Sequence, residues 1–189
     1  MASQAAGKNI GYVLVDGTEG TFRGAVLVTD FRGIPADFRY TDPITPSKIE
    51  KILYGNALDV YIKEELILES LVGAVEVTPV LWVCREGDLL DPLAKLEKSK
   101  TILLAPTARS PLDATGDIEK QNDPGSYIVQ ADGVSAPLRF SLPGEKNREE
   151  DARSAASILV EAAATMDLLE PFSRMGKAMS ALGEEKSGS

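Results

Sequence analysis

The first forty residues alternate between apolar runs and short turn sequences, which predicts a series of strands. The segment IGYVLVDG, residues 10–17, is almost continuously apolar from Tyr12 to Val15. The segment TFRGAVLVTD, residues 21–30, is a second apolar run, and ADFRYTD, residues 36–42, alternates apolar and polar positions as a half-exposed strand does. The connecting sequences GTEG and FRGIP carry turn residues. Because these connections are short, we expect an antiparallel three-stranded meander.

Helical spacing replaces the strand pattern after the meander. Residues 45–75 place apolar side chains at helical intervals, with Gly55–Asn56 as an interruption. Thr45 is the expected N-cap, and Pro46 would occupy the first helical position. The short apolar run from Val80 to Cys84 then predicts a strand that is buried on both faces.

Helical and apolar segments continue to alternate in the second half of the chain. Residues 88–100 predict a short helix and residues 101–107 a second buried strand, so we expect parallel strands joined by a helical crossover. Residues 108–126 are rich in Ser, Asp, Pro and Gly and predict a long surface loop. A hairpin is expected over 127–142, and two helices over 147–182.

The fold class predicted by this order is α+β, or mixed α/β. A three-stranded antiparallel meander is followed by helix-strand-helix-strand in a mixed sheet, then by a hairpin and a C-terminal helix pair. We expect a single domain over residues 9–182, with the long loop at 108–126, and flexible tails at 1–8 and 183–189.

The order of elements from residue 9 to residue 107 resembles that of ribonuclease H-like proteins. The resemblance is one of topology and includes no sequence motif, and similar orders occur in other α+β folds related to roadblock and longin scaffolds. Ribonuclease H-like nucleases carry carboxylates on the first strand, the first helix and the end of the fourth strand, where they hold two Mg²⁺ ions about 4 Å apart. The resemblance therefore implies a catalytic site formed by Asp16, Glu64 or Glu65, and Asp88.

The same carboxylates also have a simpler explanation. The chain contains 29 acidic residues, so chance alone supplies a trio near suitable places. Asp16 precedes a glycine and suits a turn, and it lies at the end of its predicted strand rather than in the middle.

Composition narrows the classes of function. The chain has 189 residues, of which 43% are hydrophobic and 26% charged, as in globular proteins. No apolar run approaches the roughly 18–20 residues that span a membrane, and no secretory signal precedes the first strand, so we expect a cytoplasmic protein. The net charge of −9 repels phosphate backbones on average, which makes nucleic acid an unlikely partner.

Several kinds of catalytic chemistry are excluded by the residues that the chain lacks. It contains no histidine and one cysteine, Cys84, which rules out Ser-His-Asp and Cys-His catalysis and histidine-ligated metals. We expect Cys84 to be a buried structural residue. No cofactor is expected, and a metal would have to be a hard cation such as Mg²⁺ on carboxylates.

These absences favour a non-enzymatic protein that binds macromolecules or regulates them. A protein partner or self-association through the C-terminal helices is the expected mode of action. The alternative is a Mg²⁺-dependent nuclease or phosphotransfer-type enzyme that uses Asp16, Glu65 and Asp88.

One exposed strip is the candidate binding surface under the main interpretation. In DFRYTDP we expect Phe38 and Tyr40 to point inward, leaving the polar residues of the strand exposed. The candidate binding residues are Arg39, Tyr40 and Asp42. The same segment is also explained as an ordinary corner between a strand and a helix.

Overall fold

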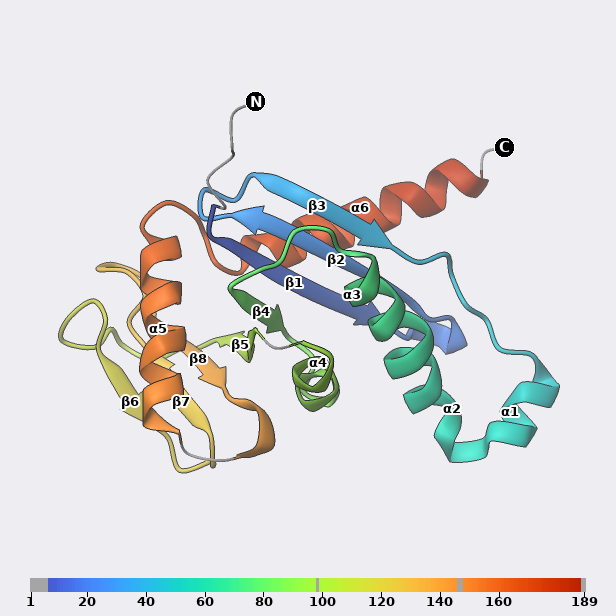
Figure 1. Ribbon diagram of the computed structural model, residues 1–189, viewed down its shortest axis with the longest axis horizontal. Coiled ribbons are helices and arrows are strands. Elements are labelled where there is room, and N and C mark those ends of the chain that lie inside the picture. The colour runs from blue at the N-terminus through green and yellow to red at the C-terminus, as the bar shows by residue number, and fades with distance from the viewer. Residues whose placement is uncertain (1–6, 98, 146–147, 188–189) are drawn as a thin grey trace.

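The computed structural model of the chain describes residues 7–97, 99–145 and 148–187. Within them, eight strands form one mixed sheet in the order β3-β2-β1-β4-β5-β8-β7-β6 (Figure 1). The strands are β1 (Asn9–Asp16), β2 (Arg23–Asp30), β3 (Pro35–Tyr40), β4 (Leu81–Cys84), β5 (Lys100–Pro106), β6 (Ile118–Lys120), β7 (Ser126–Val129) and β8 (Leu138–Ser141).

The pairing of the strands confirms the predicted fold class. β1, β2 and β3 form the antiparallel meander, while β4 pairs in parallel with both β1 and β5. β7 and β8 form the predicted hairpin, and β8 joins it to β5. The segment 108–126, predicted to be a loop, contains the short strand β6, because Ile118–Lys120 finds backbone partners along β7.

Helices cover both faces of the sheet. They are α1 (Lys48–Tyr54), η2 (Gly55–Ala57), α2 (Leu58–Val60), η3 (Tyr61–Glu69), α3 (Ser70–Ala74), η4 (Gly87–Leu89), α4 (Leu90–Leu96), α5 (Glu149–Ala163) and α6 (Glu170–Ser187), with short turns η1 (Thr18–Gly20) and η5 (Pro143–Glu145). In Figure 1, α6 lies behind β1 and β2, while the helical region that ends in α3 crosses in front of them.

Two apolar clusters follow from this layering. Side chains of α5 and α6 pack with Ile10 and Tyr12 of β1, and the ring of Phe172 meets that of Tyr12 edge-on, with 5.3 Å between their centroids. Side chains of η3, α3 and α4 pack on the other face with Val13 and Trp82. Alternate residues of β1 therefore face different helices, as expected for a strand buried on both sides.

The first helix begins later than the sequence predicted. Ser47, rather than Thr45, is the N-cap of α1, and Pro46 precedes the helix. The Ser47 hydroxyl accepts the backbone N–H of Glu50 at 3.3 Å, and the Glu50 carboxylate accepts the N–H of Ser47 at 2.7 Å. This reciprocal capping box satisfies two N–H groups that the helix leaves free. The predicted interruption is confirmed at Gly55, where φ is +53°.

The helical region then continues as a π-helix. η3 buries Ile62, Ile67 and Leu68 against the meander. Gly24 of β2 makes this approach possible, because a Cβ at Gly24 would overlap with Cγ2 of Ile67. π-Helices are rare and occur frequently at functional sites. η3 carries Lys63, Glu64 and Glu65, so its position fixes one side of the candidate site.

The last helix is longer than predicted. α6 runs through Ser187, whereas a tail was expected from residue 183; residues 1–6, 188 and 189 lie outside the described residues. Phe172, Met175 and Met179 lie on its buried face. Among the residues that the structure describes, no helix is long and apolar enough to cross a membrane.

Candidate functional site at the carboxyl ends of β1 and β4

The carboxyl ends of β1 and β4 lie side by side. The two strands are parallel neighbours, and their last paired residues are Val13 and Cys84. Asp16 ends β1, while Glu86 and Asp88 follow β4. In open α/β sheets, ligands bind outside the carboxyl ends of parallel strands. We refer to this region, formed by Asp16, Lys63, Glu86 and Asp88, as the carboxyl edge.

Asp16 is held by groups of the β1–β2 hairpin. Its Oδ2 lies 3.6 Å from Nε of Arg23, and the hydroxyl of Thr18 donates a hydrogen bond to its Oδ1. One carboxylate oxygen therefore organises the turn, and the other faces a guanidinium group.

Asp88 is paired with a cation from η3. Nζ of Lys63 lies 2.9 Å from Oδ2 of Asp88. Cε of Lys63 also lies 3.8 Å from the position of a Cβ built on Gly17, the residue after Asp16. The Lys63 side chain thus extends from beside the end of β1 to Asp88.

The predicted carboxylate trio does not form a metal site. Glu65 is exposed on η3 and Glu64 is half-buried. Within the described ranges, no group of three or more His, Cys, Asp or Glu side chains could hold a metal ion. Arg23 and Lys63 offset the negative charge of Asp16 and Asp88, so the arranged residues do not fit a pair of Mg²⁺ ions.

Glu86 is a carboxylate that the sequence reasoning missed. Its Oε2 is buried and has no hydrogen-bond partner among the described residues, while its Oε1 lies 3.7 Å from Nε of Arg85. Burial, with a smaller contribution from the negative charge of Asp88, raises the pKa of Glu86 to about 7, against the lowering effect of Arg85. A carboxyl that titrates near neutral pH can act as a general acid or base. The sequence feature that could have identified Glu86 is its position two residues after Cys84, the end of a buried strand.

Cys84 is the buried structural residue that was expected. Its Sγ donates a weak hydrogen bond to the carbonyl of Ile102, at 3.7 Å. Burial raises the pKa of this thiol to about 12, which leaves almost no thiolate at neutral pH.

Arg39, Tyr40 and Asp42 are divided between two faces of the sheet edge. Nε of Arg39 lies 2.8 Å from Oδ1 of Asp37, and its Nη2 lies 3.3 Å from Oε1 of Glu76. Tyr40 and Asp42 instead line a cavity beside α6. Asp37 was expected to point outward, but its side chain is only 9% exposed, because Arg39 and the backbone N–H of Glu76 satisfy its carboxylate. Tyr40, which was expected to point inward, is 45% exposed.

No protein-family model matches the sequence, and no curated protein matches it either. Solved structures do resemble it. Endonuclease V from Streptomyces avermitilis covers 96% of this chain and 84% of its own, with 14% identity and a TM-score of 0.58. Human ENDOV covers 98% of this chain and 87% of its own, with 14% identity and a TM-score of 0.59. Ciona intestinalis endonuclease V, crystallised with a DNA containing an inosine followed by a ribo-adenosine, covers 94% and 86%, with 12% identity and a TM-score of 0.52.

The chain has a ribonuclease H-like fold. This likeness corrects the main interpretation of the sequence, a non-enzymatic protein that acts through a protein partner or self-association. The folds that it resembles are those of nucleases, so the nuclease alternative fits better. The expectation that nucleic acid is an unlikely partner is wrong for the same reason, since a neighbour of this fold was solved with DNA. The net charge is a sum over the whole protein, so it does not exclude local positive charge such as that of Lys63 and Arg85.

Proposed function

We propose that this chain binds DNA or RNA strands and cleaves them. The observation that carries the proposal is the likeness in fold to two endonuclease V structures along 96% and 98% of the chain. The substrate class to test first is a strand with an inosine followed by a ribo-adenosine, the DNA present in a third structure of this fold. A cytoplasmic location belongs to the same proposal.

We assign the chemistry to the carboxyl edge. Glu86, whose pKa burial raises to about 7, can take up and release a proton at neutral pH. Lys63 and Arg85 supply positive charge that can face a phosphate group. Because Asp16 and Asp88 are paired with cations, we derive no step through Mg²⁺.

Strand cleavage is the direct test of this proposal. An end-labelled 24mer DNA with an inosine followed by a ribo-adenosine would be incubated with the protein, alongside a strand with adenosine in place of inosine. Each reaction would be run with Mg²⁺ and with a chelator, and its products separated on a denaturing gel. We expect the inosine strand to be cut, and Glu86→Gln to slow cutting by about 100-fold or more.

A matched control is Glu161→Gln, which alters an exposed glutamate on α5 and should leave the rate unchanged. If neither strand is cut with or without Mg²⁺, the nuclease proposal fails even where the strands bind. If Glu86→Gln and the unmodified protein cut the strand at equal rates, Glu86 takes no part in the reaction.

A further inference from the structure

A cavity of about 210 Å³ lies between the end of β3 and the C-terminal half of α6. It is lined by Arg23, Tyr40, Thr41, Asp42, Pro43, Met179, Leu182, Gly183 and Lys186. Pockets for drug-sized molecules measure about 300–1,000 Å³, so this one has room for a single ring system. Its walls come from three distant parts of the chain, and it lies outside the carboxyl edge.

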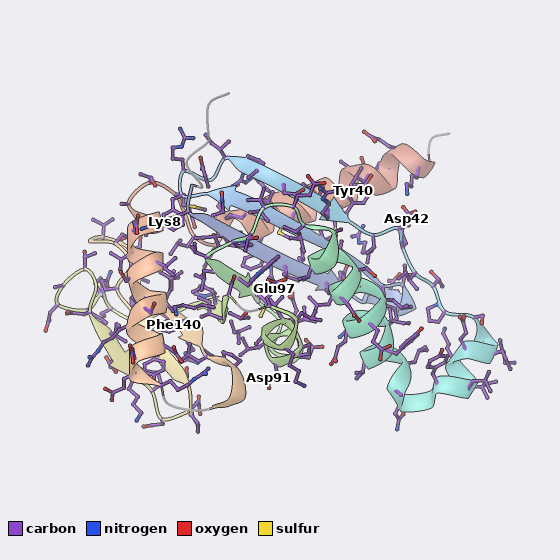
Figure 2. All side chains as sticks on the ribbon, viewed as in Figure 1. Lys8, Tyr40, Asp42, Asp91, Glu97 and Phe140 are labelled. Carbon is purple, nitrogen blue, oxygen red and sulfur yellow. The ribbon has the colours of Figure 1, made fainter. Side chains whose placement is uncertain are left out.

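An aromatic ring forms part of this cavity. Tyr40 is stacked on Phe38, with 5.8 Å between the ring centroids and 29° between the ring planes. Tyr40 is also 45% exposed, and Figure 2 shows it at the end of β3, beside α6. Met179 and Leu182 add an apolar wall. An exposed aromatic ring beside apolar side chains is the surface on which single-stranded nucleic acids stack their bases.

The polar groups of the cavity carry both signs of charge. Asp42 is exposed and forms an ion pair with Lys186 of α6. An ion pair between exposed side chains contributes little stability, so a ligand can replace Lys186 at Asp42 with small loss. An ionised carboxylate only accepts hydrogen bonds, which selects a ligand with N–H donors.

Arg23 connects the cavity to the carboxyl edge. Its Nε lies 3.6 Å from Oδ2 of Asp16, and its Nη1 donates to the carbonyl of Met179 at 3.3 Å. The same guanidinium group therefore contacts a residue of each region. A strand whose phosphates approach the carboxyl edge can place one of its bases in the cavity.

From this arrangement we infer that the cavity binds one nucleobase that is turned out of a strand, with Tyr40 as its stacking surface and Asp42 as the acceptor for its N–H edge. The inference rests on the proposed function, and it adds the part of the strand that the chain recognises. Guanine is the best match, because its ring N–H and its amino group point the same way and can both donate to one carboxylate. Hypoxanthine, the base of inosine, lacks the amino group and offers a single donor. Lys186, once released from Asp42, is available for a phosphate.

Titration with free nucleotides tests this inference without a cleavage assay. Guanosine monophosphate and inosine monophosphate would be added to isotope-labelled protein, and backbone amide shifts followed by NMR. We expect shifts at Thr41 and Gly183, with tighter binding of the guanosine nucleotide. Tyr40→Ala should weaken binding about fivefold or more. Asp42→Asn should bring the two nucleotides to similar affinities, because the amide retains one acceptor oxygen.

Tyr54→Ala is the matched control, since it removes another exposed tyrosine, at the end of α1, and should leave both affinities unchanged. Shifts absent from the cavity up to the solubility limit of the nucleotides would overturn the inference. So would unchanged affinity in Tyr40→Ala, or equal binding of phenylacetate, an aromatic anion without a base edge. The probes are free nucleotides, so the titration does not depend on cleavage. Nucleotides can fail to bind while strands are cut, and they can bind while strands are not cut. The two proposals are therefore judged separately.

Discussion

Nζ of Lys63 lies 2.9 Å from Oδ2 of Asp88, and this ion pair places a cation of η3 against the carboxylate that follows β4. Lys63→Met should leave Asp88 without a cation and increase the affinity of the carboxyl edge for divalent ions. We expect Mn²⁺ to broaden the amide signals around Asp88 more strongly in the variant than in the unmodified protein. The free energy of unfolding should change by about 1 kcal/mol or less, because the pair is partly exposed.

Lys63→Arg keeps the positive charge and is the control for this change. Equal Mn²⁺ broadening in Lys63→Met and Lys63→Arg would show that the pair does not govern cation binding at the carboxyl edge.

The raised pKa of Glu86 gives the protein a specific dependence of stability on pH. The folded state holds its proton up to about pH 7, whereas the unfolded chain releases it near 4.5, so the folded state binds more protons between these values. Stability therefore falls as pH rises through this interval, and the loss persists above it. Glu86→Gln should remove that part of the loss, and stabilise the protein by about 1–3 kcal/mol at pH 8.

Urea denaturation of Glu86→Gln and of the unmodified protein, at about pH 4 and about pH 8, measures this difference. The two proteins should differ less at the lower pH, where Glu86 is protonated in the folded state and mostly protonated in the unfolded state. A gain of the same size at both values would mean that charge on Glu86 is not the cause.

Because β2 and η3 are in close contact, we expect Gly24 of β2 not to tolerate a side chain. A Cβ at Gly24 would overlap with Cγ2 of Ile67 and lie 3.1 Å from Cδ1 of Leu71. Gly24→Ala should therefore lower the free energy of unfolding by about 1–3 kcal/mol. Gly73→Ala, where a Cβ meets nothing within 4 Å on α3, should stabilise by about 0.5–1 kcal/mol. Denaturant midpoints measure both, and similar midpoints would contradict the predicted packing.

Arg85, which follows β4, and Lys177 of α6 form the surface on which we expect a nucleic-acid backbone to bind. Arg85 and Lys177 line a shallow groove with two serines of α6, and the guanidinium of Arg85 lies 5.8 Å from the centre of the Phe172 ring. Arg85→Glu combined with Lys177→Glu should weaken strand binding about tenfold or more and make binding less dependent on salt. Fluorescence anisotropy of a labelled strand at several salt concentrations measures both effects.

Lys120→Glu combined with Arg153→Glu changes the net charge equally, at a separate hollow beside β6 and α5. This control should weaken binding much less. An equal loss in both double variants would indicate that net charge alone, and not the α6 groove, sets the affinity.

The sequence predicted the fold wherever apolar periodicity reports burial. Tyr12 and Val13 are adjacent and both fully buried, which reflects helices on the two sides of β1. β6 escaped prediction because its three residues include none that is fully buried, so it leaves no apolar pattern. The true cap of α1 was visible: Glu50 stands three residues after Ser47, whereas Lys48 stands three residues after Thr45.

The candidate site was predictable in its topology but not in its charges. Strand order places Asp16 at the end of β1 and Asp88 shortly after the neighbouring strand β4. Their cation partners could not be read from local sequence, because Lys63 lies on a helix 25 residues before Asp88. The pKa of Glu86 likewise depends on burial by the assembled fold.

The edge-on contact between Tyr12 and Phe172 joins the first strand of the fold to its last helix. A ribosome therefore completes β1 long before it makes the helix that shields it. Until α6 is made, the face of the meander that α6 covers remains in contact with water, so this sheet can be fully packed only after α6 has been made. Chaperone binding in that interval would protect the same face that α6 later covers.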